Sequence, residues 1–352
     1  MHIKITYHLM PWEIDYALLT FTQLKKSLYY LTNDVEVTID SVLNLSSNII
    51  DWDKSELPKE YFIEKYNTYS LLLDRGYTHN KRIYDGDKLY GHLDLQRECI
   101  GEEFTHYMNI CPDLYFSETA LTTLIQTIPI IKENYDQFPH FIIVPEIFQM
   151  WDDTWQEIVG SEYKDVPNNE WYTSDIFDIR ASKKYRERMA LIKDPSEKDV
   201  VELRVVKKFL KWTGWFDLYS KDLYEKIITP PKKWKGYGPW DLFSMNVVAD
   251  LFNDHNFAFL EFVVSEKIGK YSTGPLNQKK GPHTGNWIQP SIKKFLHIKE
   301  NNSKEDQRQR MGKDGDPLKQ MRNSDDSIIK KRIKSLQKDK KLWKSISINK
   351  KH

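Results

Sequence analysis

The chain has 352 residues, of which 40% are hydrophobic and 13% are aromatic. That length and composition suit one large domain with an appendage. Two cysteines are too few for a disulfide framework and fit a reducing compartment. The sequence begins directly in a strand pattern, and no stretch approaches the roughly 20 apolar residues of a membrane span. We therefore expect a soluble cytoplasmic protein.

Charge is unevenly distributed along the chain, although the net charge is only +1. Residues 301–352 hold 16 Lys and Arg against 7 Asp and Glu, whereas residues 1–300 hold 36 against 44. The acidic body argues against a protein that coats nucleic acid with its whole surface. The basic tail is compatible with a polyanionic partner.

The first 45 residues predict a strand, a helix and a second strand. Apolar residues alternate with polar ones from Ile3 to about His8–Met10, as in a strand. They then recur at helical spacing from Ile14 to Leu31. Glu13 and Asp15 would lie in the first turn, where carboxylates suit the helix dipole, so we expect a capping role for both. The second strand is predicted to end at Asp40–Ser41, and this order is typical of a nucleotide-binding α/β unit.

In residues 106–116, HYMNICPDLYF, a short apolar run of about six residues predicts a further strand that stops at a carboxylate. Its apolar run stops at Pro112-Asp113, and a helix with an apolar stripe is predicted behind Ser117 as N-cap. An acid in this position lies in the crevice where α/β proteins bind ligands. Asp113 is therefore a ligand-site candidate. The alternative is a solvated Asp in an ordinary strand-loop-helix.

The middle of the chain is less informative. Residues 44–88 lack the Gly-rich fingerprint of a dinucleotide site or a P-loop, and residues 180–208 suggest a charged surface insertion. Phe141–Val144 predicts a short strand ending at Pro145-Glu146. Four aromatic residues follow without regular spacing, and they could stack on sugar rings or bases or, as we favour, fill an irregular core. They are Trp151, Trp155, Trp171 and Tyr172.

A second acid-bearing motif lies further along the chain. Residues 213–227, TGWFDLYSKDLYEKI, predict an aromatic strand and a helix. Gly236 and Gly238 then precede Asp241 at the start of another helix. An acid beside two glycines and several tryptophans has the access and apolar surroundings that a general base needs. A carboxylate that only complements the helix dipole is the alternative. Residues 257–264 predict a last strand, followed by a Gly- and Pro-rich loop.

These segments together resemble GT-A glycosyltransferases, family-two-like enzymes that use nucleotide sugars such as UDP-sugars. The Pro-Asp segment with SETALTTLI behind it is similar to the family's metal-binding Asp-x-Asp segment, with Cys111 at the first acid. Residues 91–100, GHLDLQRECI, resemble the helix that packs beside the nucleotide. Residues 236–241 resemble the family's Gly-x-Gly-x-[Glu/Asp]-Asp motif, with Trp240 where a second acid often stands.

The resemblance covers residues 1–45, 90–125 and 210–255. It implies an α/β, GT-A-like (Rossmann-like) mixed sheet flanked by helices over residues 1–298. The nucleotide-binding half would span about 1–125 and the acceptor and catalytic half about 126–298, followed by a basic tail, 299–352. The implied activity is transfer of a sugar from a nucleoside-diphosphate sugar to an acceptor hydroxyl. A non-catalytic nucleotide-sugar or carbohydrate-binding module is the alternative.

The resemblance also implies roles for single residues. Asp113 would hold Mn²⁺ or Mg²⁺ against the diphosphate, with His283 as a further ligand or a solvated loop histidine. Asp241 would take the acceptor proton in an inverting enzyme or orient the acceptor in a retaining one. Donor contacts are expected from Tyr7, His8, Asp40, Asp94, Arg97 and Asp113. Acceptor contacts are expected from Glu146, Trp215, Gly238 and Trp240.

Two other features leave alternatives open. Asp94 and Arg97 are about one turn apart, so an ordinary i,i+3 salt bridge competes with diphosphate contact by Arg97. The tail predicts a basic amphipathic helix from about Asp326 to Ile346, which could dock on the acidic body, an anionic membrane or nucleic acid. In the last case the acceptor would be hydroxymethylated DNA bases, on which some phage-encoded glycosyltransferases act. Otherwise it would be a glycan or a small molecule.

Overall fold

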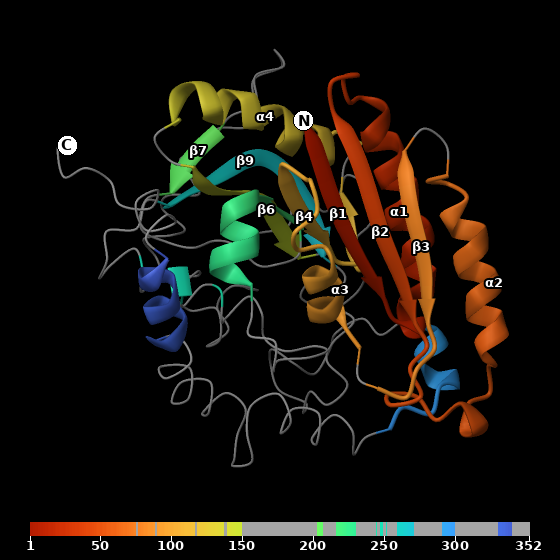
Figure 1. Ribbon diagram of the computed structural model, residues 1–352. Coiled ribbons are helices and arrows are strands. Elements are labelled where there is room, and N and C mark those ends of the chain that lie inside the picture. Colours follow the sequence, from red (N-terminus) through yellow and green to blue (C-terminus); the bar gives the residue numbers. More distant parts are fainter. Residues whose placement is uncertain are drawn as a thin grey trace.

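The computed structural model describes residues 1–74, 77–88, 90–116, 118–136, 139–149, 203–206, 216–229, 244, 247–248, 251, 259–270, 291–299 and 330–339. Within these ranges, nine strands form one sheet in the order β3-β2-β1-β4-β8-β6-β9-β5, and β7 pairs with β9 (Figure 1). The strands are β1 (His2–Leu9), β2 (Glu36–Asn44), β3 (Thr78–Tyr84), β4 (His106–Ile110), β5 (Leu114–Phe116), β6 (His140–Gln149), β7 (Leu203–Val206), β8 (Phe216–Ser220) and β9 (Phe259–Lys270).

Helices cover both faces of this sheet. The α-helices are α1 (Ile14–Tyr29), α2 (Lys59–Ser70), α3 (His92–Glu98) and α4 (Ala120–Asn134). Shorter helical turns are η1 (Pro11–Glu13), η2 (Trp52–Lys54), the π-helical η5 (Leu223–Ile228) and η6 (Ser291–Phe295). The α/β class expected from the sequence, a mixed sheet flanked by helices, is confirmed.

Strand direction and order define one special point in the sheet. Strands β1, β2, β3 and β4 run parallel, whereas β8 is antiparallel to β4 and β6. The chain places β2 and β3 on one side of β1 and then places β4 on its other side. The winding therefore reverses between β1 and β4. In open α/β sheets, ligands bind outside the carboxyl ends of the strands at such a reversal.

Alternation along β1 gives the two faces of the sheet different characters. Ile3, Ile5 and Leu9 are buried in the main apolar core with residues of α1, α2 and α4. Lys4, Thr6 and His8 point to the opposite face, against which α3 packs (Figure 1). Successive side chains of one strand thus build the core on one side and a polar layer on the other.

The start of α1 follows from local capping. The backbone N–H of Met10 donates to Glu13 Oε2 at 2.8 Å, which satisfies a donor at the start of the helical segment. The capping role predicted for Glu13 is therefore confirmed. Asp15 also lies in the first turn, where it forms an ion pair with Lys65 at 3.0 Å.

Several predicted boundaries are wrong. The second strand does not end at Asp40–Ser41, because β2 continues to Asn44. The strand predicted to end at Pro145-Glu146 continues to Gln149, with a register shift between those two residues. Part of the predicted surface insertion, Leu203–Val206, pairs with β9 as β7. Residues 44–88 contain α2 and β3, which the sequence analysis did not predict.

Residues 291–299 return from late in the chain to the loops that follow β1 and β2. The N–H groups of Asp51 and Glu56 donate to carbonyls of this segment at 2.8 and 2.9 Å, and the Lys299 N–H donates to Ile49 at 2.8 Å. Ile292 and Leu296 are buried in the main core. This segment, drawn in light blue, therefore lies at the carboxyl end of the parallel strands (Figure 1).

Residues 330–338 are helical, inside the range predicted for the tail helix. Ile333 and Leu336 are buried, and burial lowers the pKa of the Arg332 guanidinium. In the described part of the chain, no helix has the length and apolar character to cross a membrane.

Candidate functional site

The turn after β4 places Asp113 at the reversal between β1 and β4. Tyr7 of β1 lies opposite Ile110, the last residue of β4. Asp113 follows three residues later, and only 3% of it is exposed. The hydroxyl of Thr20 in α1 donates to the Pro112 carbonyl at 2.7 Å, which fixes the turn on the helix. Asp113 is thus at the expected edge of the sheet, but buried rather than open to solvent.

Tyr7 lies beneath this edge. Its ring is buried and packs on Phe21, with ring centres 4.9 Å apart. Burial raises the pKa of the Tyr7 phenol well above its usual value, and the nearby Glu13 and Asp113 carboxylates raise it further. Tyr7 therefore stays protonated, and two carboxylates approach it at the reversal. Its position on the α1 side makes it a packing residue below the edge.

His8 lies on the other face, next to a residue that the sequence analysis missed. The Asn44 side-chain amide donates to the Tyr90 carbonyl at 2.6 Å, and its nitrogen lies 3.3 Å from His8 Nε2. Burial lowers the pKa of His8 to about 3, so the imidazole is neutral near pH 7. Asn44 is a polar residue directly after the apolar pair Val42-Leu43. That pattern at a strand end was the available signal.

Helix α3 brings Asp94 and Arg97 to the same side of the sheet. Asp94 accepts from the Gly91 N–H at 3.0 Å and from Arg97 Nη1 at 3.3 Å. The ordinary i,i+3 salt bridge considered in the sequence analysis is therefore present. Burial lowers the pKa of the Arg97 guanidinium. A guanidinium has five N–H donors in a planar fork, so pairing with Asp94 leaves diphosphate contact by Arg97 as an untested prediction.

A row of polar residues crosses four strands below the edge. Asp40, Thr6, Asn109 and Asp217 lie opposite one another on β2, β1, β4 and β8. The Thr6 hydroxyl donates to Asn109 Oδ1 at 2.6 Å, and the Tyr219 hydroxyl donates to Asp217 Oδ2 at 3.1 Å. Sequence analysis missed Asn109 and Asp217. Each is a polar side chain between two apolar neighbours in a buried strand, Met108 and Ile110 around Asn109 and Phe216 and Leu218 around Asp217, which is the signal that could have identified them.

Asp40 lies within this row and not at the end of β2, where the sequence had placed it, and its contact with the donor stays a prediction. Its carboxylate forms an ion pair with Lys4 Nζ at 2.5 Å, and Lys4 also reaches Glu102 at 3.2 Å. The Cys99 thiol donates to Asp40 at 3.6 Å. Burial is the main cause that raises the pKa of this thiol, and the Asp40 carboxylate raises it further.

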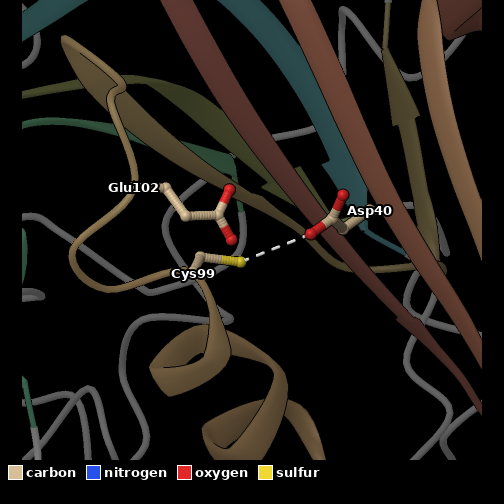
Figure 2. A group of neighbouring side chains, drawn as sticks. All are labelled: Asp40, Cys99 and Glu102. Carbon is tan, nitrogen blue, oxygen red and sulfur yellow. Dashed lines mark hydrogen bonds between the residues drawn. The ribbon is translucent and has the colours of Figure 1, made fainter.

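Asp40, Cys99 and Glu102 have the donor types of a metal site, and Figure 2 shows their side chains converging. Their ligand atoms lie within 4.8 Å of one another. However, the Lys4 ammonium contacts both carboxylates and supplies the positive charge. With Lys4 in place, these residues do not fit a metal ion. The cluster is an internal ion pair network.

The edge near Asp113 does not complete a metal site from the described residues either. Mg²⁺ and Mn²⁺ prefer several oxygen ligands. Asp113 supplies one carboxylate, Glu13 already accepts from Met10, and the Cys111 side chain has no oxygen ligand. His283, the other expected metal ligand, lies outside the described residues. No group of three potential ligands occurs at this edge within the described ranges.

Most of the expected acceptor and catalytic residues lie outside the described ranges, namely Trp215, Gly238, Trp240 and Asp241. Glu146 is placed by its backbone in β6. Behind Asp241, four described residues are helical and buried: Ser244, Val247, Val248 and Leu251. Their spacing is that of one helix face. The Ser244 hydroxyl donates to the Ile228 carbonyl at 2.9 Å, which fastens this face to η5.

A scan against protein-family models gives no match, and neither does a search of curated protein sequences. Among solved structures, the chain is similar to S. aureus TarS 1–349, with 12% identity and a TM-score of 0.39, over 75% of this chain and 60% of that one. It is similar to GalNAc-T7 with UDP, GalNAc and Mn²⁺ at 9% identity and a TM-score of 0.44, over 80% and 46% of the two chains. Mouse xyloside xylosyltransferase 1 gives 11% identity and a TM-score of 0.32, over 74% and 84%. At these values, the similarities do not indicate an activity by themselves.

Proposed function

We propose that this protein is a glycosyltransferase that moves a sugar from a nucleoside-diphosphate sugar to an acceptor hydroxyl. The observation that carries this proposal is the reversal of winding between β1 and β4, with Asp113 directly behind β4. An open α/β sheet binds ligands at such a point. The resemblance of residues 90–125 and 210–255 to GT-A segments supports a nucleotide sugar as that ligand.

Donor and acceptor would meet at the carboxyl edge. His8, Asn44, Asp94 and Arg97 supply polar groups on the α3 face for the nucleotide. The strands of residues 126–298 join the same sheet through β8, β6 and β9, which supports a shared site between a nucleotide-binding half and an acceptor half. Asp241 would take the acceptor proton if the anomeric centre inverts and orient the acceptor if it is retained.

The class of acceptor is the finer part of this proposal. On the helix formed by residues 330–338, Lys330, Lys331, Lys334 and Lys338 are exposed, while Ile333 and Leu336 are buried. At about 100° per residue, the four lysines lie within one third of the helix circumference. A cationic face of this kind favours a polyanion, so DNA with hydroxymethylated bases is the acceptor to test beside glycans.

The test separates an enzyme from a module that only binds. Isothermal titration with uridine, guanosine and thymidine diphosphate sugars, in EDTA and in Mn²⁺, measures donor binding. Assays of donor hydrolysis and transfer then measure turnover. Donor binding without turnover for every acceptor class would favour the non-catalytic nucleotide-sugar or carbohydrate-binding module.

The variant Asp241→Asn sharpens the same test. We expect donor affinity within about threefold of the unchanged protein and turnover lower by the order of 10² or more, because a general base is lost. Asp34→Asn is the matched control, since Asp34 precedes β2 at the opposite end of the sheet and is exposed. Near-normal turnover of Asp241→Asn would leave that residue as a helix-dipole carboxylate.

A further inference from the structure

The segment of residues 291–299 brings an ammonium group to the β1–β4 reversal. Lys293 lies in η6, and its Nζ is 5.9 Å from the centre of the Trp12 ring. Trp12 belongs to η1, which directly follows the carboxyl end of β1. The backbone bonds of this segment to Ile49, Asp51 and Glu56 hold η6 in that place. Lys293 is therefore a half-buried cation contributed to the edge from a distant part of the chain.

The surroundings of Lys293 are acidic and poorly solvated. Burial lowers the pKa of Lys293, while the Glu13 carboxylate acts in the opposite direction. Glu13 raises the pKa of both Lys293 and Tyr7, and Asp113 raises the pKa of Tyr7, so Glu13 connects the surroundings of Lys293 with those of Tyr7 and Asp113. The next residue, Lys294, is exposed and lies over its neighbour Phe295 at 4.9 Å. Only one of these two adjacent lysines faces the edge.

We propose that the Lys293 ammonium binds the diphosphate of the nucleotide donor at this edge. The inference rests on the proposed function and extends it to how the donor charge is neutralised. A diphosphate brings negative charge to a place where Asp113 and Glu13 are already negative, so a cation must accompany it. The described residues do not complete a metal site there. Lys293 supplies a positive charge without one, and ammonium groups bind phosphate oxygens as point charges.

The arrangement also assigns a role to the late segment. Residues 291–299 dock on the loops after β1 and β2 through backbone hydrogen bonds and through buried Ile292 and Leu296. These contacts hold the backbone of η6 and leave the Lys293 side chain half-buried beside η1. Residues 291–299 thereby act as a strap that positions the Lys293 ammonium. Arg97 on α3 is a second cation, and it is paired with Asp94.

The test compares UDP with uridine, which lacks the diphosphate, in EDTA. UDP is the first probe, and GDP with guanosine or dTDP with thymidine replaces the pair if the unchanged protein prefers another base. We expect Lys293→Gln to weaken UDP binding about tenfold or more, because a charge-assisted hydrogen bond is lost, and to leave uridine binding unchanged. Lys293→Arg should recover part of the loss. Lys294→Gln is the matched control and should bind UDP like the unchanged protein. The midpoint of thermal unfolding should be the same for each variant, which checks that residues 291–299 keep their place in the fold.

Three results would overturn the inference. The affinity of Lys293→Gln for UDP could stay within twofold of that of the unchanged protein. Its affinities for UDP and for uridine could also fall equally, which would indicate a structural role for Lys293. Alternatively, the unchanged protein could bind nucleoside diphosphates only with Mn²⁺. In each of these cases the protein still binds nucleotides and the proposed function stands. Absence of any nucleoside diphosphate binding, with or without Mn²⁺, would instead overturn the proposed function and this inference together.

Discussion

The two faces of the sheet show how one strand can serve both stability and function. On the α1 side, Ile3 and Ile5 are completely buried among apolar helix residues. On the α3 side, Lys4, Thr6 and His8 are almost as deeply buried, but each contacts a polar partner. Burial of apolar area stabilises the first face. The second face depends on hydrogen bonds and ion pairs, because a buried polar group that loses its partner costs free energy.

The polar face is itself divided along the strand direction. Near the amino ends, Lys4 is enclosed by Asp40 and Glu102, so the charges neutralise one another within the protein. Near the carboxyl ends, His8 and Asn44 lie where strands finish and loops begin. Similar chemistry therefore has a structural role in one place and lies next to the proposed donor site in the other. The variants Lys4→Met and Asp113→Asn test this division. The pH dependence of the buried histidines tests the desolvation that both faces share.

The largest effect is expected for Lys4→Met. The substitution removes the ammonium and leaves the Asp40 carboxylate without its ion-pair partner below α3. Breaking a buried ion pair by removing one member costs about 3–5 kcal/mol. We expect a loss of this order in the free energy of unfolding, measured by urea denaturation with an unchanged m-value.

Two comparisons control this result. The double variant Lys4→Met with Asp40→Asn should recover part of the loss, because position 40 then carries no carboxylate that lacks its ion-pair partner. Ile5→Val on the other face should cost only about 0.5–1.5 kcal/mol, since one methylene group is removed. If Lys4→Met costs no more than Ile5→Val, the ion pair network does not stabilise the fold.

The difference between the faces explains what could be predicted from the sequence. Period-two alternation identified β1 and period 3.6 identified α1, because apolar burial leaves these patterns directly in the sequence. β3 was missed because its sequence, THNKRIY, lies at the sheet edge with mostly exposed side chains. Its polar character resembles that of a loop.

Long-range partners account for two other features that the sequence did not reveal, Ser41 on the α1 side of the sheet and Lys4 on the α3 side. The predicted end of β2 at Ser41 is wrong because the buried Ser41 hydroxyl lies 2.6 Å from the Tyr66 hydroxyl and 2.7 Å from His79 Nε2. Both partners come from elements far along the chain. Lys4 looked like a solvent-facing residue of an alternating strand for the same reason. Asp113 was identified because the residue that ends a strand and begins a turn is visible locally.

An intermediate effect is expected for Asp113→Asn at the carboxyl edge. The variant keeps the side-chain size and removes the negative charge. We expect any gain in donor affinity from Mn²⁺ to fall by about tenfold or more, because the family-like metal ligand is lost. In EDTA, affinity should stay the same or rise, since one carboxylate no longer repels the diphosphate. Titration calorimetry in both buffers measures the two values.

Asp113 is buried, so the fold of this variant must be checked by thermal unfolding. An equal loss of donor affinity in EDTA and in Mn²⁺ would show that Asp113 supports the edge structurally. An unchanged response to Mn²⁺ would remove Asp113 from any metal site.

The smallest effect concerns pH and the buried histidines of both faces. Burial lowers the pKa of His8 on the α3 face and of His106 on the other face to about 3. An unfolded histidine has a pKa near 6.5. Above pH 6.5 both states are neutral and full stability is present. As the pH falls from 6.5 towards 3, the histidine binds a proton in the unfolded state but not in the folded state, so the free energy of unfolding decreases.

Each such histidine contributes a slope of at most about 1.4 kcal/mol per pH unit in this window. Denaturation at pH 7.5, 6.5 and 5.5 should therefore show stability falling with acidity. Replacing either histidine, by His8→Asn or His106→Asn, should reduce that slope by a similar amount, because the same desolvation acts on both faces. Ring resonances followed by NMR provide the direct measurement. A His8 midpoint near 6.5 would show that the carboxyl edge is hydrated, and the imidazole would then be available to a nucleotide in its charged form.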